Sequence, residues 1–484
     1  MTRHSSWNPG VLLAVAGLVL PLNGGSFMAA CAAADRDGEW QAGIAVAVIT
    51  PDRPMMLAGF GSRTRPAEGK ATELHAKALA LRDERGTRLV IVTHDLIGIP
   101  RTLRERVAGR VGKRFDLPSA SLLLNASHTH CGPELKMTAT ALEELSEERQ
   151  KLTTLYCKRL ENMLVELVGD ALADTAPARL SYSHARAGFA MNRRLKNPDP
   201  TGEPYLNHPN PDGPVDHDVP VLQVTWTGRK RRAILFGYAC HNTTLFVNQY
   251  AGDYAGYAQS FLERDHADTT ALFLNGCSGD QNGFPRGTVE LSRRHGRTLA
   301  TAVEAALQNR PTAVHGPLAV ALDRVQIAYQ TPPTREQLQA YLAGSPTAPF
   351  KSYELTKTHA KRLLRQITRG RKLRTTYDYP VQAVRFGDQL LLVALAGETV
   401  VDYSLRLKRE LRGTAAVWVS GYNNDVFAYI PSRRVLSEGG YEARRSMNYM
   451  TATVQPGPFA PSIEERIVGM VHQLLKRMRK GTKR

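Results

Sequence analysis

Residues 121–134 read SLLLNASHTHCGPE, an apolar run that leads to two histidines and is closed by Gly132 and Pro133. This pattern is typical of a buried strand that enters a loop. Because alternate side chains of a strand share a face, we expect His128 and His130 to point the same way. Histidines paired in this manner form a metal or acid/base site, or they are held by hydrogen bonds at a strand end. The stretch alone leaves both interpretations open.

Similar apolar, β-branched runs recur along the chain with helical stretches between them, which predicts an α/β fold with central β-sheets flanked by helices. Strands are expected at 42–50, 88–95, 121–128, 219–226, 232–241, 270–277, 317–329, 389–398 and 414–422. Apolar residues at three- and four-residue spacing predict helices at 140–172, 289–308, 334–343, 353–370, 399–412 and 462–479. The segment 197–214 is dense in Pro, Asn and Gly, so we expect a loop there that forms a rim or lid.

The first forty residues differ in composition from the rest of the 484-residue chain. Arg3 precedes the apolar run 11–22, and small residues follow it, which predicts a secretory signal peptide over residues 1–33. The run is short for a membrane span, and residues 28–31 match a bacterial lipoprotein signal imperfectly. We therefore expect an exported protein, either periplasmic, envelope-associated or secreted.

The net charge of +18 is concentrated in two segments, residues 351–378 with a net charge of +7 and the tail 476–484 with six more positive charges. Such runs are usually solvated faces, although contact with an anionic membrane surface or an envelope polyanion is the functional alternative. No zinc-finger spacing, aromatic RNA-binding motif or helix-turn-helix accompanies the charge, so nucleic acid is not an expected partner. The five cysteines contain no CxxC spacing, which argues against a disulfide framework or a cysteine-only zinc site.

Several expected strands end on side chains that bind metals or move protons. Residues 121–127 lead to the two histidines, 232–240 to His241, 389–397 to Glu398, and 414–428 to Tyr429. Rigid scaffolds commonly present reactive groups where strands enter loops. Two histidines and a carboxylate from separate strands can hold a zinc ion and leave a position open for water. The sequence therefore predicts a metal site without identifying its reaction.

Seven short motifs in this order resemble the catalytic domain of the neutral, non-lysosomal ceramidase family. They span about Gly43 to Tyr441 and read SHTHCGPE, GFAMNRR, DHDVPVL, GYACHNTTL, NGCSGDQNGF, LAGETV and NNDVFAYIPSRRVLSEGGYE. The resemblance implies a single ceramidase-like domain at residues 34–460. It also implies hydrolysis of the amide bond of an N-acylsphingosine or related N-acyl lipid through a zinc-activated water, with one zinc per chain.

The resemblance also assigns roles to individual residues. His130 is expected to act on the zinc-activated water, while Arg193 and Tyr441 are expected to face the substrate carbonyl. Asn282 aligns with a serine that lies near the substrate amide in the family, which alters the donor pattern of the pocket. The implied zinc ligands are His128, His241, Glu398 and Tyr429.

Two alternatives to ceramide hydrolysis stay open. Zinc chemistry also serves other amides and esters, and a non-catalytic envelope protein could use the basic surface to bind an anionic lipid or polymer. We expect residues 461–484 to form a helix and a basic tail where characterised ceramidases have an immunoglobulin-like domain. Asp95 and Asp280 are interpreted as carboxylates that organise loops.

Overall fold

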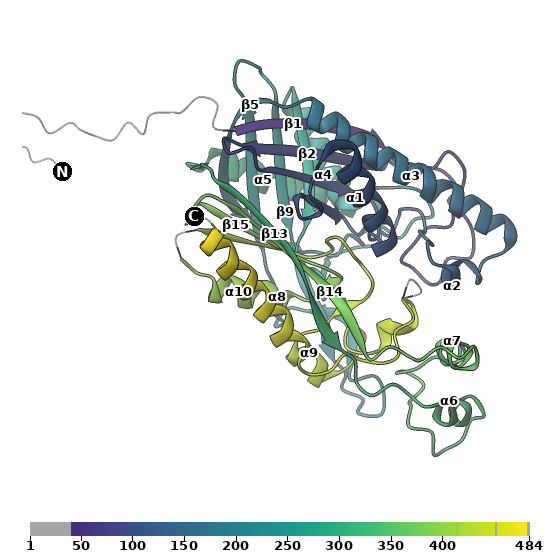
Figure 1. The fold of residues 1–484 in the computed structure, drawn as a ribbon. Helices are drawn as coiled ribbons and strands as arrows, with labels where there is room; N and C mark the ends of the chain where they lie inside the picture. Colours follow the sequence, from purple (N-terminus) through teal and green to yellow (C-terminus); the bar gives the residue numbers. More distant parts are fainter. Residues whose placement is uncertain (1–39, 414, 451–452, 482–484) are drawn as a thin grey trace, which may run out of the picture. The chain divides into compact units, whose positions relative to one another are not determined.

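The structure, a computed structural model, describes residues 40–413, 415–450 and 453–481 (Figure 1). The expected signal peptide at residues 1–33, with its alternative lipoprotein cysteine, lies outside the described residues. The described part confirms the α/β prediction, because its central β-sheets are flanked by helices.

The largest sheet has nine strands, in the order β10-β9-β8-β5-β1-β2-β3-β4, with β12 paired to β5. The pairs β9–β10 and β3–β4 are parallel, and the other neighbours are antiparallel. The strands are β1 (Trp40–Val48), β2 (His75–Asp83), β3 (Arg88–His94), β4 (Leu122–Ala126), β5 (Ala176–Arg186), β8 (Asp218–Trp226), β9 (Arg232–Tyr238), β10 (Thr269–Asn275) and β12 (Thr312–Val314).

A second sheet has the order β13-β14-β15-β17, in which β15 and β17 are parallel. Its strands are β13 (Leu318–Ala328), β14 (Thr376–Phe386), β15 (Leu390–Leu395) and β17 (Ala416–Ser420). Two small sheets complete the described strands. The first contains β11 (Gln281–Gly283), β6 (Ala190–Lys196) and β7 (Tyr205–Asn210), and the second contains β16 (Glu398–Thr399) and β18 (Tyr429–Ile430).

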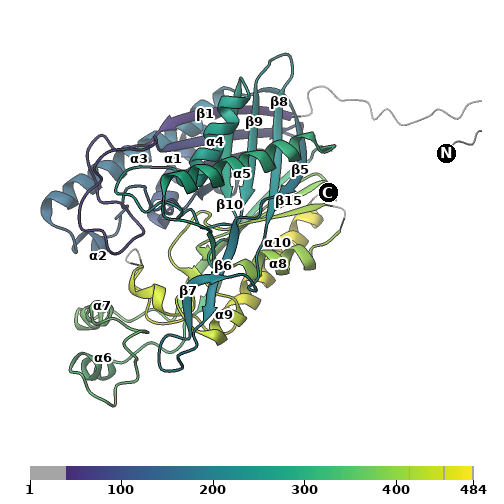
Figure 2. The same ribbon diagram turned by 180° about the vertical axis from the view of Figure 1, so that it is seen from behind.

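The two large sheets pack face to face between layers of helices (Figures 1 and 2). Trp40 and Leu123 of the first sheet share one hydrophobic cluster with Phe386 and Trp418 of the second. The outer face of the first sheet is covered by α1 (Arg101–Phe115), α3 (Glu147–Ala173), α4 (Asp253–Asp265) and α5 (Val289–Gln308). Strands covered on both faces are expected to be largely apolar, as the fully buried Leu122–Ala126 is apart from Asn125.

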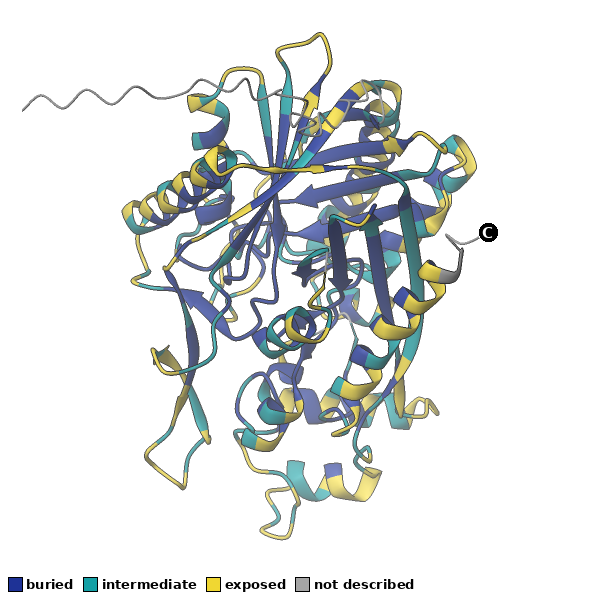
Figure 3. Ribbon diagram, turned by 90° about the vertical axis from the view of Figure 1, so that its left-hand side faces the viewer, coloured by how far each residue is buried: buried dark blue, intermediate teal, exposed yellow. Residues whose placement is uncertain are grey.

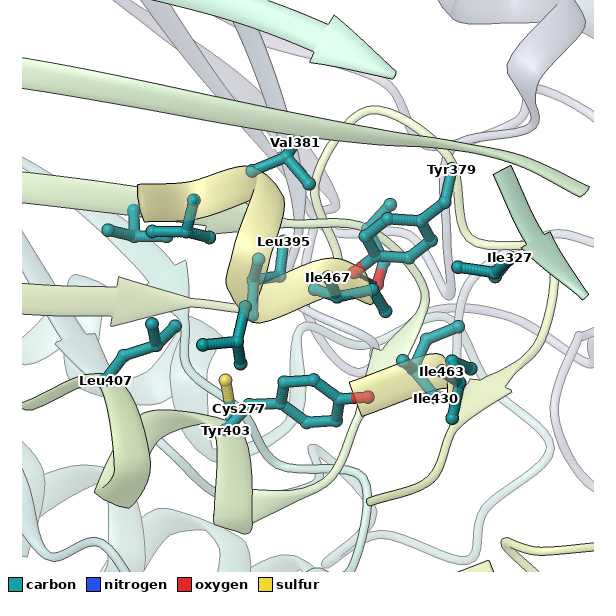
Figure 4. Close-up of a cluster of buried hydrophobic side chains, with 14 of the residues drawn as sticks. Cys277, Ile327, Tyr379, Val381, Leu395, Tyr403, Leu407, Ile430, Ile463 and Ile467 are labelled. Carbon is teal, nitrogen blue, oxygen red and sulfur yellow. Dashed lines mark hydrogen bonds between the residues drawn. The ribbon is translucent and has the colours of Figure 1, made fainter. Parts of the chain in front are cut away.

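The outer face of the second sheet is covered by α8 (Val401–Glu410) and α10 (Ile463–Gly481). Ile463 and Ile467 of α10 are fully buried against Tyr379 and Val381 of β14 (Figure 4). Their four-residue spacing places them on one face of the helix. Although our domain boundary at residue 460 precedes α10, the helix packs in the core of the second sheet.

The helices α6 (Arg335–Leu342) and α7 (Lys357–Thr368) have a small core of their own, which includes Leu338 and Leu363. The outward face of α7 carries the exposed residues Lys357, Lys361 and Arg365, as the burial colouring in Figure 3 illustrates for this part of the chain. The basic segment 351–378 is thus largely a solvated face.

The two sheets meet at a buried network of polar side chains. Asn125 of β4 accepts a hydrogen bond from Asn275 N of β10 at 2.9 Å, and its amide donates to Gly421 O at 2.8 Å and to Asn423 Oδ1 at 3.0 Å. Ser420, at the end of β17, donates to Asn275 O at 2.7 Å. We call Asn125, Asn275, Ser420 and Asn423 the asparagine junction. It joins the ends of β4, β10 and β17, and all four residues are inaccessible to solvent.

Some expected elements differ from those observed. The helix expected at 140–172 is two helices, α2 (Ala139–Leu142) and α3, because the Ser146 side chain caps a new helix by accepting from Arg149 N. The segment 197–214 is not entirely loop, since it contains β7, which pairs with β6. The strand expected to reach His128 ends at Ala126, because His128 has a φ of 64° that no strand can accommodate.

Four of the five cysteines lie within the described residues. Cys131, Cys157, Cys240 and Cys277 are buried and free of disulfide bonds. None of the helices in the described ranges has both the length and the apolar character needed to span a bilayer.

We expect Asn125→Ala to lower the free energy of unfolding by about 2–3 kcal/mol, because it leaves the buried Asn275 N–H without its acceptor and removes one of the donors to Gly421 O. Urea unfolding followed by tryptophan fluorescence measures the change. The exposed Asn162 provides the control, and Asn162→Ala is expected to change stability by less than about 0.5 kcal/mol. Equal effects of the two substitutions would contradict a structural role for the junction.

Candidate metal centre and active site

Loops that follow four separate strands converge on one buried point. His128 follows β4, and His241 follows β9, where its backbone N–H donates to Gln281 O at 2.8 Å. Glu398 lies in β16 after β15 and is paired in register with Tyr429 of β18. The structure therefore brings together the four residues that were expected to hold a metal.

The side-chain atoms of three of these residues form a closed triangle. His128 Nε2 lies 3.0 Å from His241 Nε2 and 3.1 Å from Glu398 Oε2, and His241 Nε2 lies 3.5 Å from Glu398 Oε2. The Tyr429 hydroxyl is 3.2 Å from His241 Nε2. Ligand atoms at 2.0–2.1 Å from a tetrahedral ion are about 3.3 Å apart, so these separations suit one divalent ion.

Backbone carbonyl groups orient both imidazoles of the triangle. Ile97 O lies 2.6 Å from His128 Nδ1, and Ser278 O lies 2.9 Å from His241 Nδ1. Because a carbonyl oxygen only accepts hydrogen bonds, each Nδ1 carries the proton and each Nε2 presents a lone pair. Burial, and then the positive charge of Arg193, lower the pKa of His241 well below its ordinary value, which favours the neutral ring that metals bind.

The chemistry of the triangle favours a cation at its centre. Two unprotonated Nε2 atoms and a carboxylate oxygen lie within 3.5 Å of one another, and no donor among the described residues forms a hydrogen bond with the buried Glu398 Oε2. Lone pairs gathered in this way repel one another in a buried site unless a positive charge lies among them. Nitrogen and oxygen donors of this kind suit a divalent transition-metal ion.

His130 joins this group from the same loop. Its Nε2 lies 3.2 Å from His128 Nε2, and the ligand atoms of His128, His130 and His241 all lie within 4.8 Å of one another. The two histidines of the opening motif do converge. They are brought together by a turn with left-handed backbone at His128, whereas strand alternation was expected. His128 and His241 form the closed triangle with Glu398, so His130 is a neighbour of the triangle and not one of its members.

Burial is the largest cause that lowers the pKa of His130 well below its ordinary value, followed by the charges of His128 and Arg63. The imidazole packs against Phe60, with ring centroids 4.6 Å apart. Its Nδ1 is buried and has no hydrogen-bond partner in the part of the chain that the structure describes. His130 is therefore neutral at pH 7 and has a nitrogen available to accept a proton.

Arg193 lies on the other side of the triangle and is held in place by an acidic residue that sequence reasoning missed. Its Nε donates to Glu442 Oε1 at 2.9 Å, and its Nη2 donates to the Tyr429 hydroxyl at 3.1 Å. Glu442 also accepts from Arg194 Nη1 at 2.6 Å. The only signals in the sequence were the adjacent arginines of MNRR and the glutamate directly after Tyr441. Burial raises the pKa of Glu442, yet both arginines together hold it below its ordinary value.

Tyr441 and Asn282 also lie near Arg193, as expected. The Tyr441 ring centroid is 5.3 Å from that of Tyr429 and 5.8 Å from the Arg193 guanidinium carbon. Asn282 Oδ1 accepts from Arg193 Nη1 at 3.3 Å, and its amide donates to Asn207 Oδ1 at 3.2 Å. Asn207 belongs to β7, so part of the segment expected to be a rim does reach the site.

A groove of about 970 Å³ passes Tyr441 and Asn207 at the edge of this site. Its lining mixes apolar side chains with several charged ones. Apolar contacts come from Met56, Leu57, Phe60, Leu145 and Tyr449, and charged groups from Arg63, Glu134, Lys136, Glu144, Arg149, Arg362 and Arg445. The groove is thus wide enough for a substrate and polar along much of its length.

Asp280 organises the loop between β10 and β11, as interpreted from the sequence. Its Oδ1 accepts from Val401 N at 2.8 Å, and its Oδ2 accepts from Asn192 Nδ2 at 3.3 Å. These bonds connect β6, the strand that carries Arg193, to the segment that follows Glu398. Burial, and then the nearby Asp402, raise the pKa of Asp280 to about 7.

Comparisons with known proteins identify relatives of this fold. The family model for the N-terminal domain of neutral/alkaline non-lysosomal ceramidases matches residues 40–283. A crystal structure of neutral ceramidase from Pseudomonas aeruginosa is similar, with a TM-score of 0.65, 20% identity and coverage of 90% of this chain and 75% of that chain. A ceramidase complexed with C2 gives a TM-score of 0.64, 19% identity and coverage of 90% and 76%. No curated protein sequence matches significantly.

We expect the purified protein to bind one divalent metal ion and Glu398→Gln to weaken that binding by more than about tenfold, because the substitution removes a charged ligand. Elemental analysis after dialysis against a weak chelator measures the metal content per chain. The matched control is Glu410→Gln. Glu410 lies on α8 and pairs with His472, so this variant should retain the metal. Full metal content in Glu398→Gln would contradict the triangle as the binding site.

The raised pKa of Asp280 predicts a dependence of stability on pH. Since the folded state keeps a proton that the unfolded state releases near pH 4, stability falls as the pH rises from 4 to 7. Asp280→Asn preserves an oxygen acceptor and should reduce this fall by at least about 1 kcal/mol. Urea unfolding of both proteins at pH 5 and pH 7.5 measures the effect. Parallel pH profiles would show that Asp280 does not titrate in this range.

Proposed function

The chain belongs to the neutral/alkaline non-lysosomal ceramidase family, and from this premise we propose that it is an exported zinc-dependent amidohydrolase that acts on N-acyl lipids or related amides. The observation that carries the proposal is the closed triangle of His128, His241 and Glu398 with His130 beside it. The reaction adds water across the amide bond and yields a carboxylic acid and an amine.

Zinc is the ion we assign to the triangle, with Tyr429 as the fourth ligand. Two imidazoles and one carboxylate are a donor set that zinc hydrolases use, and the separations of 3.0–3.5 Å between the donor atoms would allow all three to hold one ion. When bound, zinc supplies a Lewis acid that lowers the pKa of a coordinated water to about 7 and polarises a carbonyl group. One ion per chain is expected.

His130 is assigned the proton transfers. Its neutral ring accepts a proton from the attacking water and returns that proton to the nitrogen of the leaving amine. The position of its Nε2, 3.2 Å from His128 Nε2, places it next to the metal site. Phe60 limits the freedom of the ring, which keeps the nitrogen directed toward the reacting atoms.

Arg193 and Tyr441 are assigned to the carbonyl oxygen of the substrate. Glu442 and Tyr429 fix the Arg193 guanidinium before the substrate arrives, so little reorganisation is needed when negative charge develops on that oxygen. The Tyr441 hydroxyl is a second donor from the groove side. Each donor of this kind contributes roughly 3 kcal/mol to transition-state stabilisation. Asn282 borders the same space and is assigned to binding of the substrate amide.

The basic face of α7 and the tail support a second part of the proposal, peripheral contact with an anionic membrane surface. Lys357, Lys361 and Arg365 are exposed, and Arg362 of the same helix lines the groove. Clustered positive charge favours association with anionic headgroups and falls in strength with added salt. This contact would place the groove near lipid substrates.

We expect zinc-loaded protein to release fatty acid from a fluorescent N-acylsphingosine in mixed micelles, and a chelator to abolish the release. His130→Ala should lower kcat by about 100-fold or more while zinc content stays at one per chain, because only proton transfer is removed. The exposed His184, paired with Asp218, gives the control His184→Ala, which should retain full activity. Wild-type turnover by zinc-loaded His130→Ala would refute its role.

A further inference from the structure

Arg286 is a half-buried cation beside the active site with unused hydrogen-bonding capacity. Its guanidinium carbon lies 5.3 Å from the centre of the Phe284 ring, and no hydrogen bond or ion pair with a residue of the described ranges engages it. The loop that carries it is fixed, because Gly287 N donates to Thr244 O at 2.7 Å and Phe284 N donates to Phe189 O at 3.0 Å. A rigid loop thus holds an unpaired guanidinium.

The loop that carries Arg286 borders the site. It follows Asn282 directly, and Asn282 forms a backbone bridge with His241. Gly287, the residue after Arg286, donates to Thr244 O in the segment that follows His241. Arg286 is therefore held next to the segments that carry Asn282 and His241.

Arg63 is a second cation without an acidic partner at the same site. Its guanidinium donates only to Ala58 O, Val247 O and His130 O and to the Cys131 sulfur. Within residues 40–413, 415–450 and 453–481, no acidic side chain forms an ion pair with Arg63 or Arg286. Arg63 also lines the large groove, so its charge acts on whatever the groove holds.

The charges of the site do not balance. Arg193 and Arg194 are neutralised by Glu442 and Glu438 at 2.6–3.0 Å, whereas the two unpaired arginines have no such counterpart. Burying a cation without a partner costs desolvation free energy, and an anionic ligand that enters the site offsets this cost. Ceramide has a neutral headgroup and would leave the two charges without a partner.

Resting on the proposed amidohydrolase function, we propose that Arg286, assisted by Arg63, selects amides that carry an anionic group next to the scissile bond. The planar guanidinium of Arg286 suits a carboxylate or a phosphate, both of which accept two parallel hydrogen bonds. The substrate class is therefore an N-acyl amino acid or an N-acyl amine that bears a phosphate.

The experiment compares isosteric ligands that differ in charge. Binding of N-dodecanoylglycine, N-dodecanoylethanolamine and the phosphate ester of the latter to the zinc-loaded protein is measured by calorimetry, and hydrolysis of each is measured separately. We expect the wild-type protein to bind the preferred anionic ligand at least about tenfold more tightly than the neutral one. The carboxylate and phosphate arms show which anionic group is preferred.

Arg286→Gln removes the charge without breaking a hydrogen bond within the described chain, so the fold should be unaffected. It should reduce the anionic preference by about tenfold while affinity for the neutral ligand stays the same, and Arg286→Lys should retain part of the preference. Arg65→Gln, which removes an equally charged but exposed side chain, should leave the preference intact. Equal metal content in all variants shows that the effect does not come from the ion.

The outcomes separate this inference from the function on which it rests. Equal binding of neutral and anionic ligands, or a preference that survives Arg286→Gln, overturns the inference even if all the amides are hydrolysed. An anionic preference that depends on Arg286 supports the inference. If that preference appears without hydrolysis of any amide, then the amidohydrolase proposal fails while selection of an anionic group stands.

Discussion

The asparagine junction is the constraint on which the site depends. Asn125 and Asn275 join the ends of β4 and β10, although these strands lie at opposite ends of the strand order in the nine-stranded sheet. Asn423 connects the same point to β15 by donating to Leu395 O at 3.1 Å. Together with the backbone bridges Asn125–Asn423 and Gly276–Ser420, these side chains fix the strand ends, so the loops after these strands begin from one rigid place.

Two of the residues of the triangle follow the junction, or the strand that it bonds, at a short distance along the chain. His128 comes three residues after Asn125, and Glu398 comes three residues after Leu395. Loops this short leave little freedom, and carbonyl groups such as Ile97 O then set the orientation of the imidazoles. The result is a buried set of lone pairs that a cation would stabilise. The positive charges of the surrounding arginines outnumber the negative charges of the nearby acidic side chains. We therefore propose that the fold sets both a metal site and the preferred charge of its ligand.

The sequence predicted the fold class and half of the described strands, because apolar strands between two covering layers produce strong patterns, but it missed long strands such as β2, β5 and β14. It could not show that β4 and β10 meet, since Asn125 and Asn275 look like ordinary residues at strand ends. Convergence of His128, His241, Glu398 and Tyr429 was expected mainly through family resemblance, and spacing alone left it open. Glu442 and Arg286 were missed because their importance comes from which partners they have or lack, and partners are set by tertiary contacts. The sequence pattern around His128 likewise suggested strand alternation and did not predict the left-handed backbone at this residue.

Anomalous diffraction at the zinc absorption edge, from crystals of the zinc-loaded protein, tests the central claim most directly. The account predicts one peak at about 2.0–2.2 Å from Nε2 of His128, Nε2 of His241 and a carboxylate oxygen of Glu398, with His130 outside the coordination sphere. A peak bound by the three histidines, with Glu398 unliganded, would contradict the assignment of His130 as the proton-transfer group. Absence of any peak at the triangle would contradict the metal site itself.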